Sequence, residues 1–299
     1  MVSTRDWAPD PELLEVTKKH LQPVLDLETA ILRDLEVSKY STRLSSKGIR
    51  RNQCTMGSLV TSSVKKALKA QCCMLNAGSI RGNLDYDADH KYFTFGDLKT
   101  EVPFDSEVVI CQIPGHVLAA AVKWSRKGWK SVDSGGFLQV DNGVKVDIVE
   151  DGSDPGHHIV EMNHQPFNPD QQYRVVLLYS TLNGMDNIVP IKDYAAANRA
   201  FLPPEDAGLP LKIVLANYFY AEIWTSLGDL SKLDLNGDGK LDKSEIKAAL
   251  LNKTGVEVPD TTIERIVNAM DLNKDGSVEL KEAIEGVIKV EEAHTRHRG

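Results

Sequence analysis

The chain has 299 residues, of which 41% are hydrophobic and 26% are charged, and its net charge is -8. This size and apolar content suffice for about two packed domains, and the negative charge disfavours a nucleic-acid partner. The chain has no apolar run of the roughly 18 residues that a membrane-spanning helix needs, and no basic start followed by an apolar stretch. We therefore expect a cytoplasmic protein without a membrane partner. Four cysteines are too few for a disulfide framework, and the pair Cys72-Cys73 lies in an apolar run typical of buried thiols.

The first half of the chain predicts helices followed by a short buried strand. Residues 11–37 carry apolar side chains at helical spacing, interrupted by Pro23, and predict one or two helices. A further helix is expected over 56–70, and a strand over 71–75 that ends in the turn Asn76-Ala-Gly78.

A mixed pattern of strands and helices follows. Strands are expected over 107–113 and 173–179, and a helix over 115–127. Residues 137–140 and 144–149 flank Asp141-Asn-Gly143 and predict a hairpin. Pro203-Pro204 and Gly208-Leu-Pro210 then mark a linker.

Two twelve-residue stretches near the C-terminus, which begin at Asp234 and Asp271, have the pattern of calcium-binding loops. Calcium takes six or more oxygen ligands from such a loop, with glycine at position 6 for the sharp turn. Gly239 and Gly276 stand at that position, and apolar residues at position 8 suit a short β-bridge between the loops. Because helical segments flank both loops, the sequence predicts a paired EF-hand with two Ca²⁺ sites. The candidate ligands are Asp234, Asn236, Asp238, Lys240 (through its carbonyl), Asp242 and Glu245, then Asp271, Asn273, Asp275, Ser277, Glu279 and Glu282.

The predicted fold class is therefore α+β. It comprises a helical lead-in over residues 1–48, a mixed α/β domain over 49–215, an all-α EF-hand pair over 216–292 and a disordered tail over 293–299.

Short motifs in the first domain occur in the order found in one enzyme family. The run Asn76-Ala-Gly-Ser-Ile-Arg81 resembles the fingerprint of the C-terminal domain of 5'-nucleotidases. Upstream, Arg50-Arg-Asn-Gln-Cys-Thr-Met-Gly-Ser-Leu59 resembles a second element of that family, with Gln53 where glutamate is usual. Val102-Pro-Phe104, Gly136-Phe-Leu-Gln139 and Asn183-Gly-Met-Asp186 follow in family order. The resemblance covers roughly residues 10–200.

The resemblance implies a domain that grips a nucleotide or nucleoside. Arg50 and Arg81 would approach phosphate and ribose, since a guanidinium offers forked donors. Asn76 would orient the ligand, Phe104 would stack on the base, and Asp193 would bind the ribose. The family's second aromatic position holds Ile188, so a base would meet an aliphatic wall there.

The same resemblance implies a metallophosphatase domain that this sequence does not contain. Two-metal hydrolysis needs clustered Asp, His and Asn ligands. The nearest imitations, around His90, His157 and His164, are interpreted as surface or loop histidines. We therefore expect no catalytic residues, no catalytic divalent metal and no phosphatase activity from this chain alone.

Two interpretations remain open. The chain is the C-terminal part of a nucleotide-hydrolysing enzyme, with a metallophosphatase domain supplied upstream. Alternatively, it is a non-catalytic calcium sensor or scaffold whose nucleotidase-like domain no longer binds nucleotide.

Overall fold

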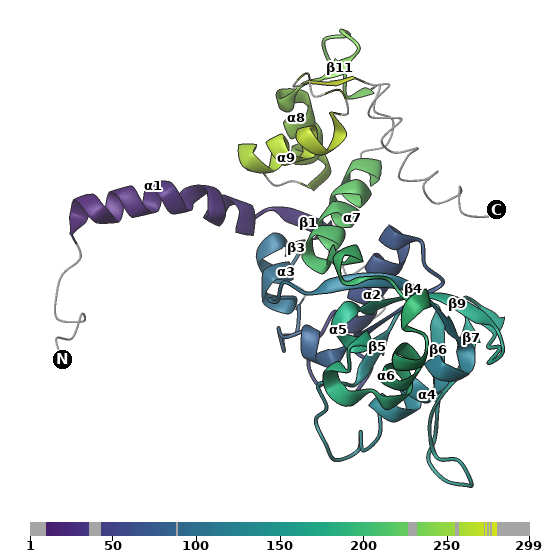
Figure 1. Cartoon of the computed structure of the whole chain (residues 1–299). Helices are drawn as coiled ribbons and strands as arrows, with labels where there is room; N and C mark the ends of the chain where they lie inside the picture. Colours follow the sequence, from purple (N-terminus) through teal and green to yellow (C-terminus); the bar gives the residue numbers. More distant parts are fainter. Residues whose placement is uncertain are drawn as a thin grey trace.

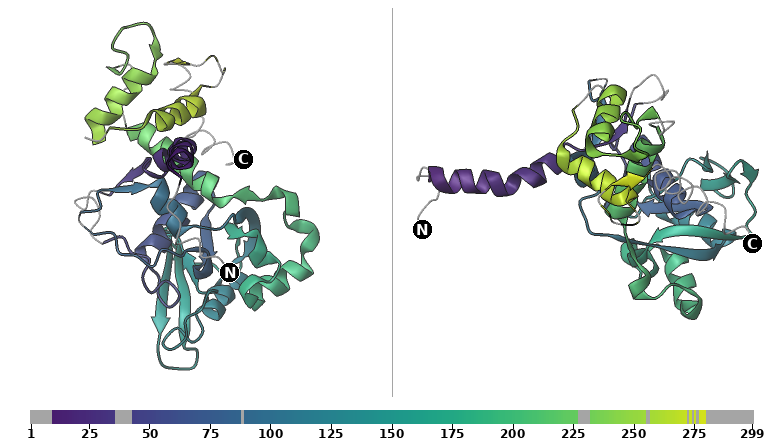
Figure 2. Two further views of the ribbon diagram at one scale, coloured as in Figure 1. Left: turned by 90° about the vertical axis from the view of Figure 1, so that its left-hand side faces the viewer. Right: turned by 90° about the horizontal axis from the view of Figure 1, so that it is seen from above.

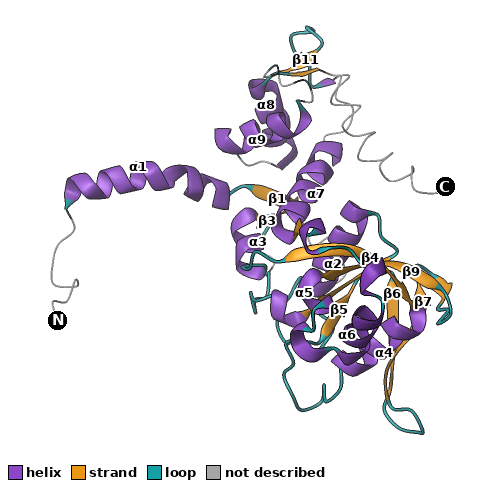
Figure 3. Ribbon diagram, in the orientation of Figure 1, coloured by secondary structure: helices purple, strands orange, loops and turns teal. Residues whose placement is uncertain are grey.

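The computed structural model describes residues 10–35, 43–87, 89–226, 232–254 and 257–271, together with residues 273, 275 and 277–279. It contains a mixed α/β body with an extended N-terminal helix, and a smaller helical unit at the C-terminal end (Figure 1 and Figure 3). The predicted fold class, a mixed α/β domain followed by a helical EF-hand region, is confirmed. None of the described helices is both long and apolar enough to cross a membrane.

Helix α1 (Pro11–Glu28) extends away from the body, as two perpendicular views agree (Figure 1 and Figure 2). It begins at Asp10, whose carboxylate accepts hydrogen bonds from the N–H groups of Glu12 (2.9 Å) and Leu13 (3.2 Å). The chain then forms strand β1 (Ile31–Asp34), which pairs with β3 (Tyr92–Thr94). The prediction of helix through residue 37 is wrong over β1, because a short apolar run fits a buried strand as well as a helix.

The central sheet has the strand order β10-β4-β9-β2-β5. Strands β2 and β9 run parallel, and the other neighbours are antiparallel. The five strands are β2 (Cys72–Asn76), β4 (Glu107–Pro114), β5 (Leu138–Val140), β9 (Gln172–Leu178) and β10 (Leu209–Pro210). The predicted linker thus contributes an edge strand to the sheet.

Helices cover both faces of this sheet. On one face, α2 (Thr55–Leu68) packs with Cys73 and Leu75, and on the other α4 (Gly115–Ser125) packs with Cys72 and Met74. Adjacent residues of a strand point to opposite faces, so the two vicinal cysteines enter different cores. All four cysteines are buried and free, and burial had been predicted for the pair Cys72-Cys73. Further helical elements are α3 (Phe95–Glu101), α5 (Tyr179–Leu182), α6 (Val189–Ala197), η3 (Ala77–Ser79), η4 (Met185–Asn187), η5 (Arg199–Phe201) and η6 (Glu205–Ala207).

The predicted hairpin around Asp141 is wrong, although both of its strands exist. Strand β5 pairs with β2, whereas β6 (Val144–Val149) pairs with β7 (Gly156–Met162) in a separate sheet with β8 (Gln165–Pro166). The carboxylate of Asp141 accepts hydrogen bonds from Lys65 Nζ (2.7 Å) and from the backbone N–H groups of Cys73 and Gly143 (both 2.8 Å). The side chain therefore joins helix α2 to β2 and to the turn at residues 141–144, which the N–H of Val144 closes on the carbonyl of Asp141 (3.0 Å).

Helix α7 (Leu211–Ser226) belongs to both units of the protein. Its first turns bury Leu211, Leu215 and Phe219 against α2, and Tyr220 and Ile223 pack against the core of the helical unit. That unit contains α8 (Lys243–Thr254) and α9 (Asp260–Met270). Strand β11 (Lys240–Leu241) precedes α8, strand β12 (Val278–Glu279) follows α9, and the two strands pair with each other. The predicted boundary at residue 215 falls inside α7, and the predicted tail 293–299 lies outside the described residues.

His157, interpreted from sequence as a surface or loop histidine, is buried on β7 with 4% of its surface exposed. Its ring packs edge-on against Trp129 (5.2 Å between centroids) and Phe137 (6.2 Å). Burial, reinforced by the nearby charge of Arg126, lowers the pKa of His157 from 6.5 to about 4. The imidazole is therefore neutral in the folded protein at pH 7.

A pH-dependent stability follows from this histidine. Its pKa is lower in the folded state, so protonation favours the unfolded state, and the stabilising contribution present above pH 6.5 is lost as the pH falls towards 4. We expect the melting temperature of the wild type to fall more steeply between pH 6.5 and 4.5 than that of His157→Phe, measured by circular dichroism. Parallel curves for the two proteins would contradict this assignment.

Candidate functional site

The first candidate calcium loop is held by its own carboxylates. Asp234 Oδ1 accepts hydrogen bonds from the N–H groups of Gly237 (2.7 Å) and Asp238 (3.1 Å), and its Oδ2 accepts one from Gly239 (2.9 Å). Gly237 and Gly239 have φ angles of +73° and +81°, a region that other L-residues rarely adopt. The glycine predicted at position 6 is therefore required by the turn.

Glu245, the last candidate ligand of this loop, lies against the loop backbone and is only 6% exposed. Its Oε1 accepts hydrogen bonds from the N–H groups of Leu235 (2.8 Å) and Asn236 (3.3 Å), and its Oε2 accepts one from Asp242 (3.0 Å). The Ser244 hydroxyl donates to Asp242 (2.6 Å) and holds the pKa of that carboxyl below its ordinary value. The Glu245 carboxylate is thus directed into the loop.

The described part of the second loop repeats the pattern of the first. The N–H of Asp275 donates to Asp271 Oδ1 (3.1 Å) and to Asn273 Oδ1 (2.8 Å). In the first loop the N–H of Asp238 donates to Asp234 Oδ1 (3.1 Å) and Asn236 Oδ1 (2.9 Å). Gly276 and Glu282 lie outside the described residues.

The two loops face each other through the predicted bridge. Leu241 pairs with Val278 and Lys240 with Glu279, in antiparallel register. Both position-8 side chains are fully buried. The Lys240 ammonium reaches the second loop, 3.0 Å from Ser277 Oγ and 3.5 Å from Asp275 Oδ2. The loops therefore form one unit.

The donor set of these loops suits a hard cation. Carboxylate, amide and carbonyl oxygens alternate along twelve residues, and sulfur and imidazole ligands are absent from both loops. Within the described ranges, no three His, Cys, Asp or Glu side chains gather as they would around a bound metal. The loop carboxylates accept hydrogen bonds from loop amides instead, so the same oxygens are available to Ca²⁺ in place of those N–H donors.

A second candidate site lies at the end of β2. Asn76 is 4% exposed, and its Nδ2 donates to Asp186 Oδ2 (2.5 Å). Its Oδ1 is buried and accepts no hydrogen bond in the described structure, which is rare for a buried polar atom. Asp186, whose role sequence reasoning missed although its motif was noted, has a φ of +57°. A turn in a sparsely populated conformation therefore orients Asn76.

Arg50 and the loop 134–136 lie in the same region as Asn76. The carbonyl of Arg50 accepts a hydrogen bond from the N–H of Ser134 (3.1 Å), and Gly135 accepts one from the N–H of Gly78 (2.7 Å). A Cβ on Gly136 would lie 2.9 Å from the Cβ of Asp186, so only glycine fits there. Four motifs that were recognised separately in the sequence, those containing Arg50, Asn76, Gly136 and Asp186, are thus connected by these contacts.

Arg81 and Phe104, predicted separately as ligand-binding residues, lie next to each other. The Arg81 guanidinium carbon is 5.2 Å from the centroid of the Phe104 ring, and 46% of Phe104 is exposed. An exposed ring next to a cation offers a stacking surface and a hydrogen-bond donor to an incoming ligand.

The remaining family positions differ from expectation. Ile188 is 1% exposed and packs in the core with Ile191, so the aliphatic wall predicted there is wrong. Trp124, whose indole N–H donates to the carbonyl of Asn187 (3.1 Å), is 41% exposed beside this turn. Asp193 lies exposed on α6, and no hydrogen bond or ion pair joins it to the other four candidate residues in the described structure.

Comparisons with known proteins identify both domains. Residues 33–193 match the family described as 5'-nucleotidase, C-terminal domain, and residues 230–288 match the EF-hand domain pair. The 5'-nucleotidase of Homo sapiens is 27% identical over 169 residues, which cover 50% of this chain and 29% of the human protein. Calmodulin-like protein 3 of Arabidopsis thaliana is 41% identical over 49 residues, covering 16% of this chain and 31% of that protein.

The fold also resembles a solved structure, that of a 5'-nucleotidase precursor from Thermus thermophilus. The TM-score is 0.51 at 20% sequence identity, over 73% of this chain and 42% of the other. The matched regions span less than half of the length of each of these relatives.

Proposed function

Because this chain belongs to the 5'-nucleotidase C-terminal domain family and carries an EF-hand pair after that domain, we propose that it is a calcium-binding protein whose first domain binds a nucleotide or nucleoside. The observation that carries the nucleotide proposal is the buried Asn76 Oδ1 without a hydrogen-bond donor. A buried acceptor left unsatisfied costs about 1–3 kcal/mol. A ligand hydroxyl or amine that donates to it would recover much of that cost.

A second pair of candidate residues supports the same class of ligand. The Arg81 and Phe104 pair supplies a cation and an exposed ring, which match a phosphate or ribose hydroxyl and a base. The EF-hand pair supports Ca²⁺ binding, and we propose that both loops hold an ion.

Hydrolysis is proposed only for an assembly in which a metallophosphatase domain meets this chain. The apolar side chains of α1 favour such a partner, since Leu13 is 65% and Val16 52% exposed on a helix that extends away from the body (Figure 1). A non-catalytic calcium sensor is the second candidate. The burial of Ile188 favours it, because one of the two rings that would enclose a base in the family is replaced by a core residue.

Titration calorimetry with adenosine and adenosine monophosphate tests the nucleotide proposal. We expect millimolar or tighter binding to the wild type and a loss of about 10-fold in Phe104→Ala, since base stacking on an aromatic ring contributes about 1–3 kcal/mol. Arg81→Ala should weaken the monophosphate more than the nucleoside.

Phe201→Ala is the matched control, because Phe201 is 87% exposed on a different segment. It should bind both ligands as the wild type does. If neither ligand binds the wild type at millimolar concentration, the sensor proposal replaces the nucleotide proposal.

A further inference from the structure

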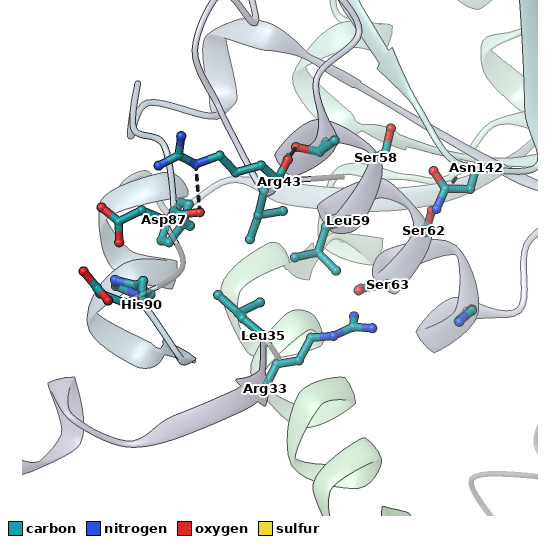
Figure 4. A pocket seen from close by; sticks show the side chains of 15 residues that line it. Arg33, Leu35, Arg43, Ser58, Leu59, Ser62, Ser63, Asp87, His90 and Asn142 are labelled. Carbon is teal, nitrogen blue, oxygen red and sulfur yellow. Dashed lines mark hydrogen bonds between the residues drawn. The ribbon is translucent and has the colours of Figure 1, made fainter. Parts of the chain in front are cut away.

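A cavity of about 650 Å³ lies between β1, α2 and the turn before β3 (Figure 4). Its size falls in the range of small-molecule sites, about 300–1,000 Å³. Leu35, Leu44 and Leu59 form its apolar wall, and the rest of its lining is polar.

One side of this cavity is a continuous polar face of α2. Thr55, Ser58, Ser62 and Lys66 line it at intervals of three or four residues, a spacing that places side chains on one face of a helix. Ser58 Oγ accepts a hydrogen bond from Gln53 Nε2 (2.9 Å), and Ser62 Oγ accepts one from the N–H of Asn142 (3.0 Å). Their hydroxyl hydrogens are therefore left to donate to a ligand.

Ser63 also lines the cavity. It is 2% exposed, and its side chain points into the cavity beside Leu59 (Figure 4). Its hydroxyl can donate a hydrogen bond to a polar ligand atom in the cavity.

Charges of both signs surround the cavity. Arg33 lies on the side of Ser63, and its Nη1 is 3.6 Å from Glu222 Oε2 on α7 (Figure 4). Lys66 forms no ion pair among the described residues and is exposed at the same helix face. Asp87 lies on the opposite side, close to Arg43, whose Nε donates to the carbonyl of Tyr86 (3.4 Å). The two cations and the hydroxyls of α2 therefore define an anion-binding end, and the leucines define an apolar one.

We infer that this cavity binds a phosphate monoester that carries an apolar chain or ring. The phosphate would be held by Lys66, Arg33 and the hydroxyls of Ser62 and Ser63, since cations and hydroxyl donors suit its oxygens. The apolar body would lie against Leu35, Leu44 and Leu59. The site is distinct from the Asn76 site, because the two share no residue.

Displacement of the fluorescent anion 1-anilinonaphthalene-8-sulfonate from the full chain tests the inference. We expect decyl phosphate, kept monomeric, to compete at least tenfold better than inorganic phosphate or decanol, because only decyl phosphate uses both ends of the cavity. Vesicles containing phosphatidic acid distinguish the source of the ligand. Competition by vesicles and monomer indicates a membrane lipid, and competition by the monomer alone indicates a soluble ester.

Two variants and two controls keep the test decisive. Lys66→Glu reverses an exposed charge and should weaken decyl phosphate at least tenfold, and Ser63→Leu should fill the cavity and weaken all competitors. Lys145→Glu, a charge reversal on β6, and Arg81→Ala should leave binding unchanged. Equal competition by decyl phosphate and decanol, or an unaltered affinity in Lys66→Glu, would overturn the inference.

Discussion

Replacement of Glu245 by glutamine is expected to weaken calcium binding at the first loop by about 100-fold. A carboxylate at position 12 offers two anionic oxygens to the ion, whereas the amide offers one neutral oxygen. Each hydrogen bond or contact to a charged group contributes about 1.5–3 kcal/mol, and about 2.7 kcal/mol corresponds to 100-fold. Because Glu245 is also bonded to three loop N–H groups, the substitution disturbs the loop even without calcium.

Calorimetric titration of the chelator-treated protein measures this effect. The wild type should bind two ions, Glu245→Gln and Glu282→Gln one each with high affinity, and the double variant none. Glu264→Gln is the matched control, since Glu264 is an exposed acid on α9 and lies outside both loops. Two unaltered binding steps in both single variants would refute the ligand assignment.

The sequence predicted these loops well because their determinants are local. Twelve consecutive residues supply the ligands, the turn glycine and the apolar residue at position 8. The pairing of Leu241 with Val278 was foreseeable because any two such loops join at that position. The nucleotidase-type motifs and their order could also be recognised from the sequence, since each motif is a short contiguous run.

Features that depend on distant partners could not be predicted. Strand β1 forms only because β3, about sixty residues later, offers its backbone. The side chain of Ile188 turns into a core built from α4 and α6, which the sequence does not place relative to each other. The turn at Asp141-Asn-Gly143 forms, but the strands beside it do not pair with each other, because β5 pairs with β2 and β6 with β7. In each case a tertiary contact overrode a local preference.

Helix α7, which follows the predicted linker, connects the first domain to the EF-hand pair as a continuous helix. A flexible linker would leave the EF-hand pair independent of the first domain, but α7 is one continuous helix that packs in both cores. Glu222 on this helix pairs with Arg33 (3.6 Å), and Tyr218 donates to the same carboxylate (2.5 Å). Reorientation of the helices on calcium binding, which is typical of EF-hand sensors, would therefore act on the first domain through α7 and Arg33.

Substitution of Asp141 by asparagine is expected to destabilise the first domain by roughly 3–5 kcal/mol, the range found when one partner of a buried ion pair is removed. The Asp141 side chain is fully buried, and Lys65 is 18% exposed. All three groups around the carboxylate are donors, namely Lys65 Nζ and two backbone N–H groups. An amide would turn its own NH₂ group towards one of them and leave Lys65 without a counter-ion.

Chemical denaturation of Asp141→Asn, Lys65→Met and the double variant separates the causes. If the loss arises from the unpaired ammonium, the double variant should be more stable than the sum of the single changes predicts, because removing both charges leaves neither one buried alone. Asp154→Asn, which removes the acid of the exposed pair with Lys123, should unfold at the wild-type midpoint. A wild-type midpoint for Asp141→Asn would mean that the apolar packing of β2 and β5 alone holds the connection between β5 and β6. Asp141 would then be an ordinary turn residue.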